Sequence, residues 1–410
     1  MEIPDIKTEK VERNGNGDFV ITVAVTSDSA VCHKCGRNIT KFYGYGRETE
    51  LRHLPILGHK TYIRIRPKRY ECPYCAGKPK TTQRVSWYDV GSSHTRAFED
   101  HIMLAMVSST VTDVSMKEDI GYEAVMGMIG RRVGCESDWN SFRKLGIIGI
   151  DEISLKKGHK DFVTIITSYT DAGIRILGIV VGREKVGVKN FLSCIPKRLQ
   201  KSIKAVCCDM YEGYISAVKE VFGKKVAVVA DRFHVAKLYR KDLETLRKQE
   251  MKRLKKKLPD KEYKKLKGAM WALRKNESEL RSDESEVLRR LFRHSPLLKT
   301  AYELCGELTY IFNRRISKDK AKKEIGIWAE LVRLFGMNLF ESFISTLEKH
   351  MEEITNYFSE RLTGGFVEGL NNKIKVIKRR CYGIFNVRHL FQRIFIDMEG
   401  YSLFGCRGKI

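Results

Sequence analysis

Three acidic residues stand at the ends of short apolar runs. Asp151 follows "GIIGI", Asp209 follows "KAVCC" and Asp231 follows "VAVVA". Groups just beyond strand ends line the crevice where open α/β sheets bind ligands, so these carboxylates can converge although they lie far apart in the chain. Converging carboxylates bind two hard cations about 4 Å apart, which activate water and stabilise a leaving oxygen in phosphodiester chemistry. Taken singly, each acid would be an ordinary helix cap or turn residue.

A fourth acid, Glu368, heads a stretch whose other charges are all positive, "FVEGLNNKIKVIKRRCYGI". On a helix with about 100° per residue, Glu368 shares an exposed face with Asn372, Lys375 and Arg379. The opposite face is an apolar stripe of Val367, Leu370, Ile374, Ile377 and Cys381. Glu368 is therefore a candidate further metal ligand. The alternative is a solvated surface helix with mixed charges.

Two C-x-x-C pairs form a second set of possible ligands. They are "CHKC", with Cys32 and Cys35, and "ECPYC", with Cys72 and Cys75. Four thiolates in two chelating pairs are the ligand set of tetrahedral structural zinc, whereas a redox dithiol needs only one pair. The histidines that could replace a thiolate are His33, His53 and His59. The chain has eleven cysteines, an odd number, which reduced thiols plus one metal site explain better than a disulfide framework.

The charge balance predicts a polyanionic partner. Lys and Arg number 76 against 50 Asp and Glu, a formal net charge of +26. The basic residues are spread over every segment, which fits nucleic acid better than a membrane surface. In "KTYIRIRPKRYEC", alternation places Tyr62 with three cations on one strand face, a candidate DNA contact or else a solvated strand. The three cations are Arg64, Arg66 and Lys68.

A helical hairpin is predicted next. Residues 97–109 read as a helix, and "VSMKEDIGYEAVMGMIGRRV" follows with Gly121 between a short helix and one ending in Arg131 and Arg132. The pattern resembles a DNA-binding helix-turn-helix, although Gly-containing helical hairpins are also common in protein cores.

The remaining elements must position the acids. From residue 145, three apolar runs followed by strand-helix alternation predict an α/β or α+β sheet. Residues 233–360 lack such runs and are dense in Lys, Arg, Glu and Leu, which predicts a long helical insertion. The first thirty residues lack a signal peptide's apolar core and no uncharged apolar run reaches about 18 residues, so a soluble cytosolic protein is expected.

Four motifs together closely resemble one known family. They are "GIDEISLKKGHKDFVTIITSY", "DMYEGY", "ADRFHVAKL" and "EGLNNKIKVIKRRCYGIFNVRHLFQRI". The sequence resembles the transposases of the ISL-three group of bacterial insertion sequences over nearly the whole chain.

The resemblance implies a ribonuclease-H-like catalytic core with a DDE triad, Asp151, Asp209 and Glu368, that holds two Mg²⁺ or Mn²⁺ ions. It implies cleavage at the element's ends followed by strand transfer into target DNA. Lys375 and Arg379 would then contact phosphates, and "DRFH" makes Asp231 and His234 accessory candidates. The expected partners are double-stranded DNA, both terminal repeats and target, and a second copy in the synaptic complex, without a membrane. The protein would be cytoplasmic in a bacterium and nucleoid-associated when bound to DNA.

The predicted organisation has five parts. They are a zinc-binding module (1–80), a helix-turn-helix (96–135), a first part of the core (143–232), the helical insertion (233–360) and a second part of the core (361–398). Two alternative functions stay open: a catalytically silent DNA-binding regulator, and a ribonuclease-H-like nuclease without strand transfer.

Overall fold

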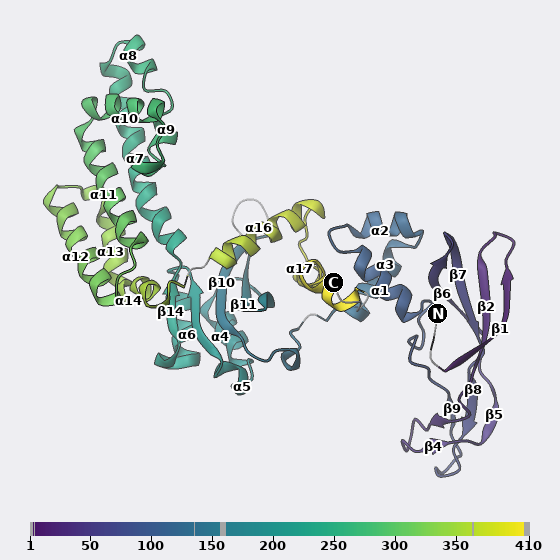
Figure 1. Cartoon of the computed structure of the whole chain (residues 1–410). Helices are drawn as coiled ribbons and strands as arrows, with labels where there is room; N and C mark the ends of the chain where they lie inside the picture. The colour runs from purple at the N-terminus through teal and green to yellow at the C-terminus, as the bar shows by residue number, and fades with distance from the viewer. Residues whose placement is uncertain (1–2, 4, 135, 156–160, 363–364, 406–410) are drawn as a thin grey trace. The chain divides into compact units, whose positions relative to one another are not determined.

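The computed structural model describes residue 3 and residues 5–134, 136–155, 161–362 and 365–405. The chain forms two compact units, Met1–Gly134 with Gln392–Ile410, and Cys135–Phe391 (Figure 1). Their boundary falls inside α17 (Val387–Phe404), whereas the sequence pattern extends the catalytic core to residue 398. None of the described helices combines the length and apolar composition needed to cross a bilayer.

A four-stranded sheet opens the first unit. Its strands are β1 (Ile6–Arg13), β2 (Phe19–Val25), β6 (Thr49–Ile56) and β7 (His59–Ile65), in the order β1-β2-β7-β6. Alternate side chains of β7 are buried, because in a strand successive residues point to opposite faces. The predicted face from Tyr62 to Lys68 is shorter than expected, since β7 ends at Ile65 and Lys68 begins another strand.

Two smaller sheets surround the cysteine pairs. One consists of β3 (Ala30–Val31) and β4 (Asn38–Ile39), and the other of β5 (Phe42–Tyr45), β8 (Lys68–Glu71) and β9 (Lys80–Thr82). Cys32 and Cys72 directly follow β3 and β8, and both pack with Ile39 and Tyr70 in a small buried cluster.

Three helices complete the first unit with the end of α17. They are α1 (Arg96–Ala105), α2 (Val111–Glu118) and α3 (Tyr122–Arg132). Thr95 and Thr110 cap α1 and α2, each accepting a hydrogen bond from a backbone N–H of the first turn. α1 ends four residues before the predicted residue 109, because Ser108 adopts a left-handed φ of 57° that a helix cannot continue. Ile396 of α17 packs into the core of these three helices.

The second unit contains a five-stranded sheet. Its strands are β10 (Gly146–Ser154), β11 (Phe162–Thr170), β12 (Gly173–Val181), β13 (Ile203–Cys208) and β14 (Ala227–Ala230). The order is β12-β11-β10-β13-β14, in which β10, β11 and β12 are antiparallel neighbours while β13 and β14 run parallel to β10. The intervening helices are α4 (Lys185–Ser193), α5 (Lys197–Gln200) and α6 (Glu212–Phe222). Their apolar faces share a buried core with the sheet.

α16 (Gly365–Arg380) packs on β10 at close range. A Cβ atom added to Gly149 would come within 2.4 Å of Val367 Cγ2 and 2.8 Å of a ring carbon of Phe366. Only glycine therefore allows this approach. The predicted apolar stripe is confirmed for Val367, Leu370, Ile374 and Ile377, which are at most 4% exposed, whereas Cys381 lies beyond the helix end.

The residues between β14 and α16 are helical, as expected. α7 (Arg232–Lys257) leaves the sheet directly after β14 and is the longest helix of this part (Figure 1). Its partners are α8 (Asp260–Lys264), α9 (Ala269–Ala272), α10 (Ser282–His294), α11 (Pro296–Asn313), α12 (Lys318–Leu334), α13 (Glu341–Lys349), α14 (Met351–Thr355) and α15 (Tyr357–Glu360). They share one apolar core in which Trp328 is 2% exposed and its indole N–H donates to the carbonyl of Leu304 at 2.8 Å.

Candidate functional site

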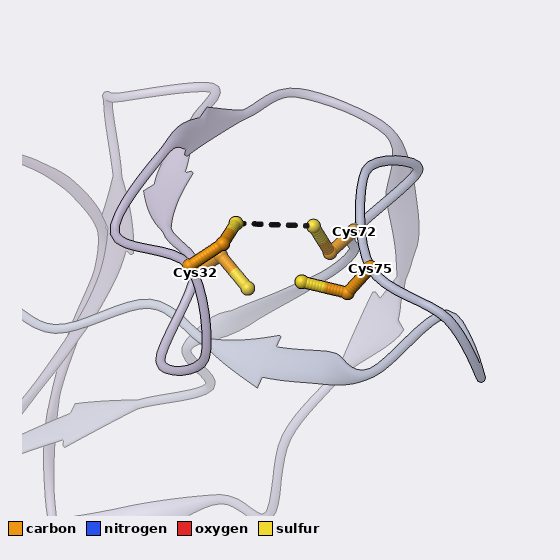
Figure 2. Close-up of side chains that lie close together, drawn as sticks. Cys32, Cys72 and Cys75 are labelled. Atoms are coloured by element: carbon orange, nitrogen blue, oxygen red, sulfur yellow. Dashed lines mark hydrogen bonds between the residues drawn. The ribbon is translucent and has the colours of Figure 1, made fainter.

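The four paired cysteines form the first candidate site. Their sulfur atoms all lie within 4.8 Å of one another, and Figure 2 shows Cys32 on one side of the cluster with Cys72 and Cys75 on the other. The Sγ atoms of Cys35 and Cys72 are 3.7 Å apart. Zinc with Zn–S bonds of about 2.3 Å and tetrahedral geometry requires S–S separations of roughly 3.8 Å. The donor set and its spacing therefore fit a structural zinc ion, and none of the three candidate histidines belongs to the cluster.

Backbone donors already favour thiolate chemistry in this cluster. The backbone N–H of Cys35, helped by that of Lys34, lowers the pKa of Cys32 to about 6, although burial opposes this. The hydrogen bond with Cys35 instead raises the pKa of Cys75 to about 12. Cys32 thus ionises readily while Cys75 resists a second negative charge, a conflict that a bound cation removes.

The second candidate site brings together the three aspartates that follow apolar runs. Asp209 and Asp231 directly follow β13 and β14, as expected for strand ends, whereas Asp151 lies inside β10, which continues to Ser154. Gly149 of β10 pairs with Cys207 of β13, and Cys208 pairs with Ala230 of β14. Continuing these parallel registers by one or two residues sets Asp151 beside Asp209, and Asp209 beside Asp231. Neighbouring strands lie about 4.8 Å apart, so the three acids occupy one level of the sheet.

These three aspartates and His234 line one small pocket, together with Val367 of α16. Asp209 Oδ1 accepts from the backbone N–H of Tyr211 at 2.9 Å, and Asp231 caps α7 by accepting from the N–H of Phe233 at 3.0 Å. Each therefore also has the turn or cap role that is ordinary for an aspartate, and the second oxygen of Asp231, Oδ2, lies 3.7 Å from His234 Nδ1.

Burial raises the pKa of Asp151, and the charges of Asp209 and Asp231 raise it further. The N–H of Glu152 and the nearby His234 act in the opposite direction. Carboxylate oxygens are the ligands that Mg²⁺ prefers, so the donor set fits that ion. In the described part of the chain, only the four cysteines bring three possible ligand atoms within 4.8 Å of one another, so the carboxylates are not drawn into an equally tight cluster.

α16 reaches Asp151 through a residue that sequence reasoning did not assign to it. The side-chain N–H of Asn371 donates to the Asp151 carboxylate, and Asn371 is 6% exposed. Its Oδ1 is buried and lacks a hydrogen-bond partner among the described residues. Glu368 lies one turn earlier and is half-buried, and the described lining of the pocket includes its neighbour Val367 instead. The helical projection predicted the exposed face correctly but could not tell which turn of α16 meets Asp151.

A lysine that the sequence did not single out holds α16 on the sheet. Lys378 Nζ donates to the carbonyls of Ser154 and Leu155, at 2.7 and 3.1 Å, and burial lowers the pKa of this lysine. Lys375 and Arg379, the cations expected to meet phosphates, are exposed.

Among the other cations predicted to contact DNA, some form ion pairs within the protein and one is exposed. Arg64 lies between Glu12 and Glu50, at 3.1 and 3.0 Å, and Lys68 pairs with Asp28 at 2.6 Å. Arg66 is exposed, with its guanidinium carbon 5.7 Å from the Tyr45 ring centroid.

Arg131 and Arg132 bind α1. Arg131 pairs at 2.6 Å with Glu99, whose side chain is 1% exposed, and Arg132 pairs with Asp100. Both arginines thereby hold α3 against α1, a structural role that their position at a helix end did not reveal.

An aromatic and basic surface around β5 was not predicted. Phe42, Tyr43 and Tyr45 are 52%, 47% and 57% exposed. Lys80 Nζ lies 3.7 Å from the ring centroid of Tyr43 and lowers the pKa of that phenol through a hydrogen bond and its charge. The stretch "KFYGYGR" carried the signal, since aromatic residues interleaved with cations are typical of nucleic-acid surfaces.

The chain combines a cysteine cluster suited to zinc with an α/β unit that carries aligned acids. Comparison with known proteins identifies the class of protein that has these features. Residues 148–394, more than half of the chain, match the ISL-three family model described as transposase. Residues 28–75 match a model described as the zinc-finger of transposase IS204/IS1001/IS1096/IS1165. The chain belongs to the ISL-three family of transposases, as the sequence motifs predicted.

Curated relatives extend the similarity over nearly the full chain. The transposase for insertion sequence element IS1001 of Bordetella parapertussis is 26% identical over 383 residues, which cover 92% of this chain and 90% of that protein. The transposase for insertion sequence element IS1557 of Mycobacterium tuberculosis is 26% identical over 423 residues, covering 97% and 93%.

Proposed function

We propose that this transposase binds the terminal repeats of its insertion sequence, cleaves the DNA there and transfers the freed strand into target DNA. The observation that carries the proposal is the common level of Asp151, Asp209 and Asp231 on three adjacent parallel strands, lining one pocket. The family membership supplies the reaction class.

The sheet supports a ribonuclease-H-like core. Three antiparallel strands followed by two parallel ones, in the order β12-β11-β10-β13-β14, agree with that fold as the sequence motifs implied it. The long insertion between β14 and α16 separates the aspartates from Glu368 in sequence, as the resemblance predicts for this family.

In this proposal, Asp151, Asp209 and Glu368 hold two divalent cations, and Asp231 and His234 are accessory. When bound, such ions lower the pKa of water and stabilise charge on attacking and leaving oxygens. Asn371 holds the Asp151 carboxylate in place through its amide N–H. The exposed Lys375 and Arg379 neutralise phosphates, because cations on the same helix face as an acid offset its repulsion of DNA.

DNA recognition is assigned to the first unit. The zinc module and the α1–α3 helices, with α2 and α3 as the helix-turn-helix, would bind double-stranded terminal repeats. Arg66 and the aromatic surface around β5 are the exposed candidates, since Arg64, Lys68, Arg131 and Arg132 are engaged in ion pairs. Two DNA ends must meet in transposition, so a homodimer is the expected active form.

The test is a cleavage and joining assay with labelled DNA carrying the candidate terminal repeats and Mg²⁺. Asp151→Ala, Asp209→Ala and Glu368→Ala should each abolish both steps while DNA binding persists. Glu212→Ala is the matched control, because Glu212 is exposed and pairs with Lys349 at 3.1 Å, outside the pocket lining.

Three outcomes would change the proposal. Wild-type protein that binds the repeats without nicking or joining them would be a DNA-binding regulator. Cleavage without joining would make the protein a nuclease. An active Glu368→Ala variant beside an inactive Asp231→Ala variant would transfer the third ligand position to Asp231.

A further inference from the structure

A basic groove runs along α7 from the candidate catalytic pocket. Its lining begins at Asp231 and continues over the first four turns of α7 to Arg247, and it also includes Leu273 and Arg274. Six cations and two acids line it, so the wall has a clear positive excess. Between Asp231 and Arg247 the helix rises about 24 Å, the length of roughly seven nucleotides at 3.4 Å each.

Some cations that line this groove are held by other side chains of the protein, and others are exposed to solvent. Arg232 donates to Tyr357 and Asn313, and Arg247 is held by Glu244 at 2.6 Å, so both have structural partners. Lys237 and Lys241 are exposed one helical turn apart on the same face of α7. They are suited to successive contacts with a phosphate backbone.

The groove has apolar lining residues, one exposed aromatic ring in its lining and a second one, Trp271, beside the lining residue Arg274. Ala236, Leu243 and Leu273 are among the apolar residues. Phe233 is 51% exposed, beside Asp231 and His234, and Trp271 is 61% exposed. Aromatic rings interleaved with cations are platforms on which unpaired bases can stack.

Arg274 contacts both the exposed ring of Trp271 and a cation of α7. Its guanidinium carbon lies 5.1 Å from the Trp271 ring centroid, and its carbonyl accepts from Arg240 at 3.1 Å. A planar cation stacked on an indole, next to apolar lining residues, offers both a phosphate contact and a platform for a base.

We propose that this groove binds an unpaired stretch of DNA strand next to the cleavage site. Charge complementarity selects a polyanion. The apolar lining, with Phe233 in it and Trp271 beside Arg274, selects exposed bases, which a paired duplex does not offer. The inference rests on the proposed function, because it assigns to the helical insertion the strand that enters or leaves the same pocket.

The test compares binding of two sequence-independent probes by the full-length protein. One is a fluorescein-labelled oligonucleotide of about 15 thymidines and the other is a random duplex of about 30 base pairs. Lys237→Glu/Lys241→Glu should weaken thymidine-strand binding at least tenfold and make its salt slope shallower by about 1.4, since each single-strand phosphate contact contributes roughly 0.7.

The matched control is Lys322→Glu/Lys323→Glu, an equal charge change at exposed positions of α12 outside the groove lining. It should change the affinity less than twofold. Thermal melting of both variants checks that they are folded, and Trp271→Ala, which changes no charge, should also weaken strand binding.

Photocrosslinking of the same strand containing 5-iododeoxyuridine adds a direct readout. Crosslinks in the peptides around Phe233 or Trp271 support the groove. Crosslinks confined to residues 5–134, or equal strand affinity in the groove and control variants, would overturn it. If the groove variant loses duplex binding as much as it loses strand binding, the groove binds duplex DNA and the unpaired-strand proposal is overturned.

The binding assay is independent of catalysis. If no assay shows cleavage, the proposed function is overturned, while the strand-binding result still tests the groove. If cleavage is intact and the groove variant binds the strand like wild type, the groove proposal is overturned and the proposed function stands.

Discussion

Replacing Gly149 with alanine should push α16 away from β10 and disturb the candidate catalytic pocket. The added Cβ would lie 2.4 Å from Val367 Cγ2, 2.7 Å from Thr167 Oγ1 and 2.8 Å from Phe366, and real Cβ contacts are not this short. Such overpacking costs about 1–3 kcal/mol. At roughly 2–4 °C per kcal/mol for a unit of this size, the melting temperature should fall by about 2–12 °C.

The functional consequence follows from what α16 carries. Any outward movement of the helix separates Asn371 from Asp151, and it moves Glu368 in the same direction. Mg²⁺-dependent cleavage by Gly149→Ala should therefore fall at least tenfold at a temperature where the variant is still folded. Differential scanning calorimetry and the cleavage assay measure the two effects separately.

Two further variants make the reasoning refutable. Gly306→Ala on α11 is the control, because a Cβ there would meet nothing within 4 Å, and it should keep or raise the melting temperature. Adding Val367→Ala to Gly149→Ala removes the nearest clash and should restore part of the loss. A Gly149→Ala protein that melts within 1 °C of wild type and cleaves normally would show that the site does not need this close approach.

Three other predictions concern single side chains. Asp151→Asn should abolish cleavage yet stabilise the magnesium-free protein by about 0.5–2 kcal/mol near neutral pH. The reason is that the pKa of Asp151 is raised in the folded protein, so its ionised carboxylate destabilises the folded wild type. The difference in unfolding free energy between the two proteins, measured by urea denaturation, should vanish as the pH falls below the ordinary aspartate pKa. Asn371→Ala should leave DNA binding unchanged and slow cleavage at least tenfold, since the Asp151 carboxylate loses its donor; an unchanged rate would remove Asn371 from the site. Cys32→Ser should lower bound zinc, measured by atomic absorption, from about one to near zero per chain, whereas Cys194→Ser, at an exposed cysteine outside the cluster, should not; equal zinc in both would refute the site.

Local patterns predicted much of the fold. The strands containing Ile63 and Ile150, the buried stripe of α16 and the helical insertion follow from periodicity, because backbone geometry alone sets which side chains share a face. The ends of elements were less predictable. α1 stops at Ala105 because Ser108 turns left-handed where its backbone N–H meets Asp397, a residue nearly 300 positions away in the chain.

The candidate site shows the same division. Apolar runs ending in Asp151, Asp209 and Asp231 were visible in the sequence, and so was the cationic surrounding of Glu368. The partner of Asp151 on α16 was not, because the contact with Asn371 depends on how far α16 slides along β10, which Gly149 and Val367 set through packing. Likewise the ion pair of Arg131 with Glu99 depends on the crossing of two helices.

The sequence by itself determined which chemistry is available: two chelating cysteine pairs, acids at strand ends and a basic chain, because ligand type and short-range spacing are written in consecutive residues. Only the tertiary structure decided which of those groups meet. Asp151, Asp209 and Asp231 lie at one level of the sheet, Asn371 is the neighbour of Asp151, and Arg131 and Arg132 pair with acids of α1. These arrangements depend on registers and packing between segments far apart in the chain, which no local pattern encodes.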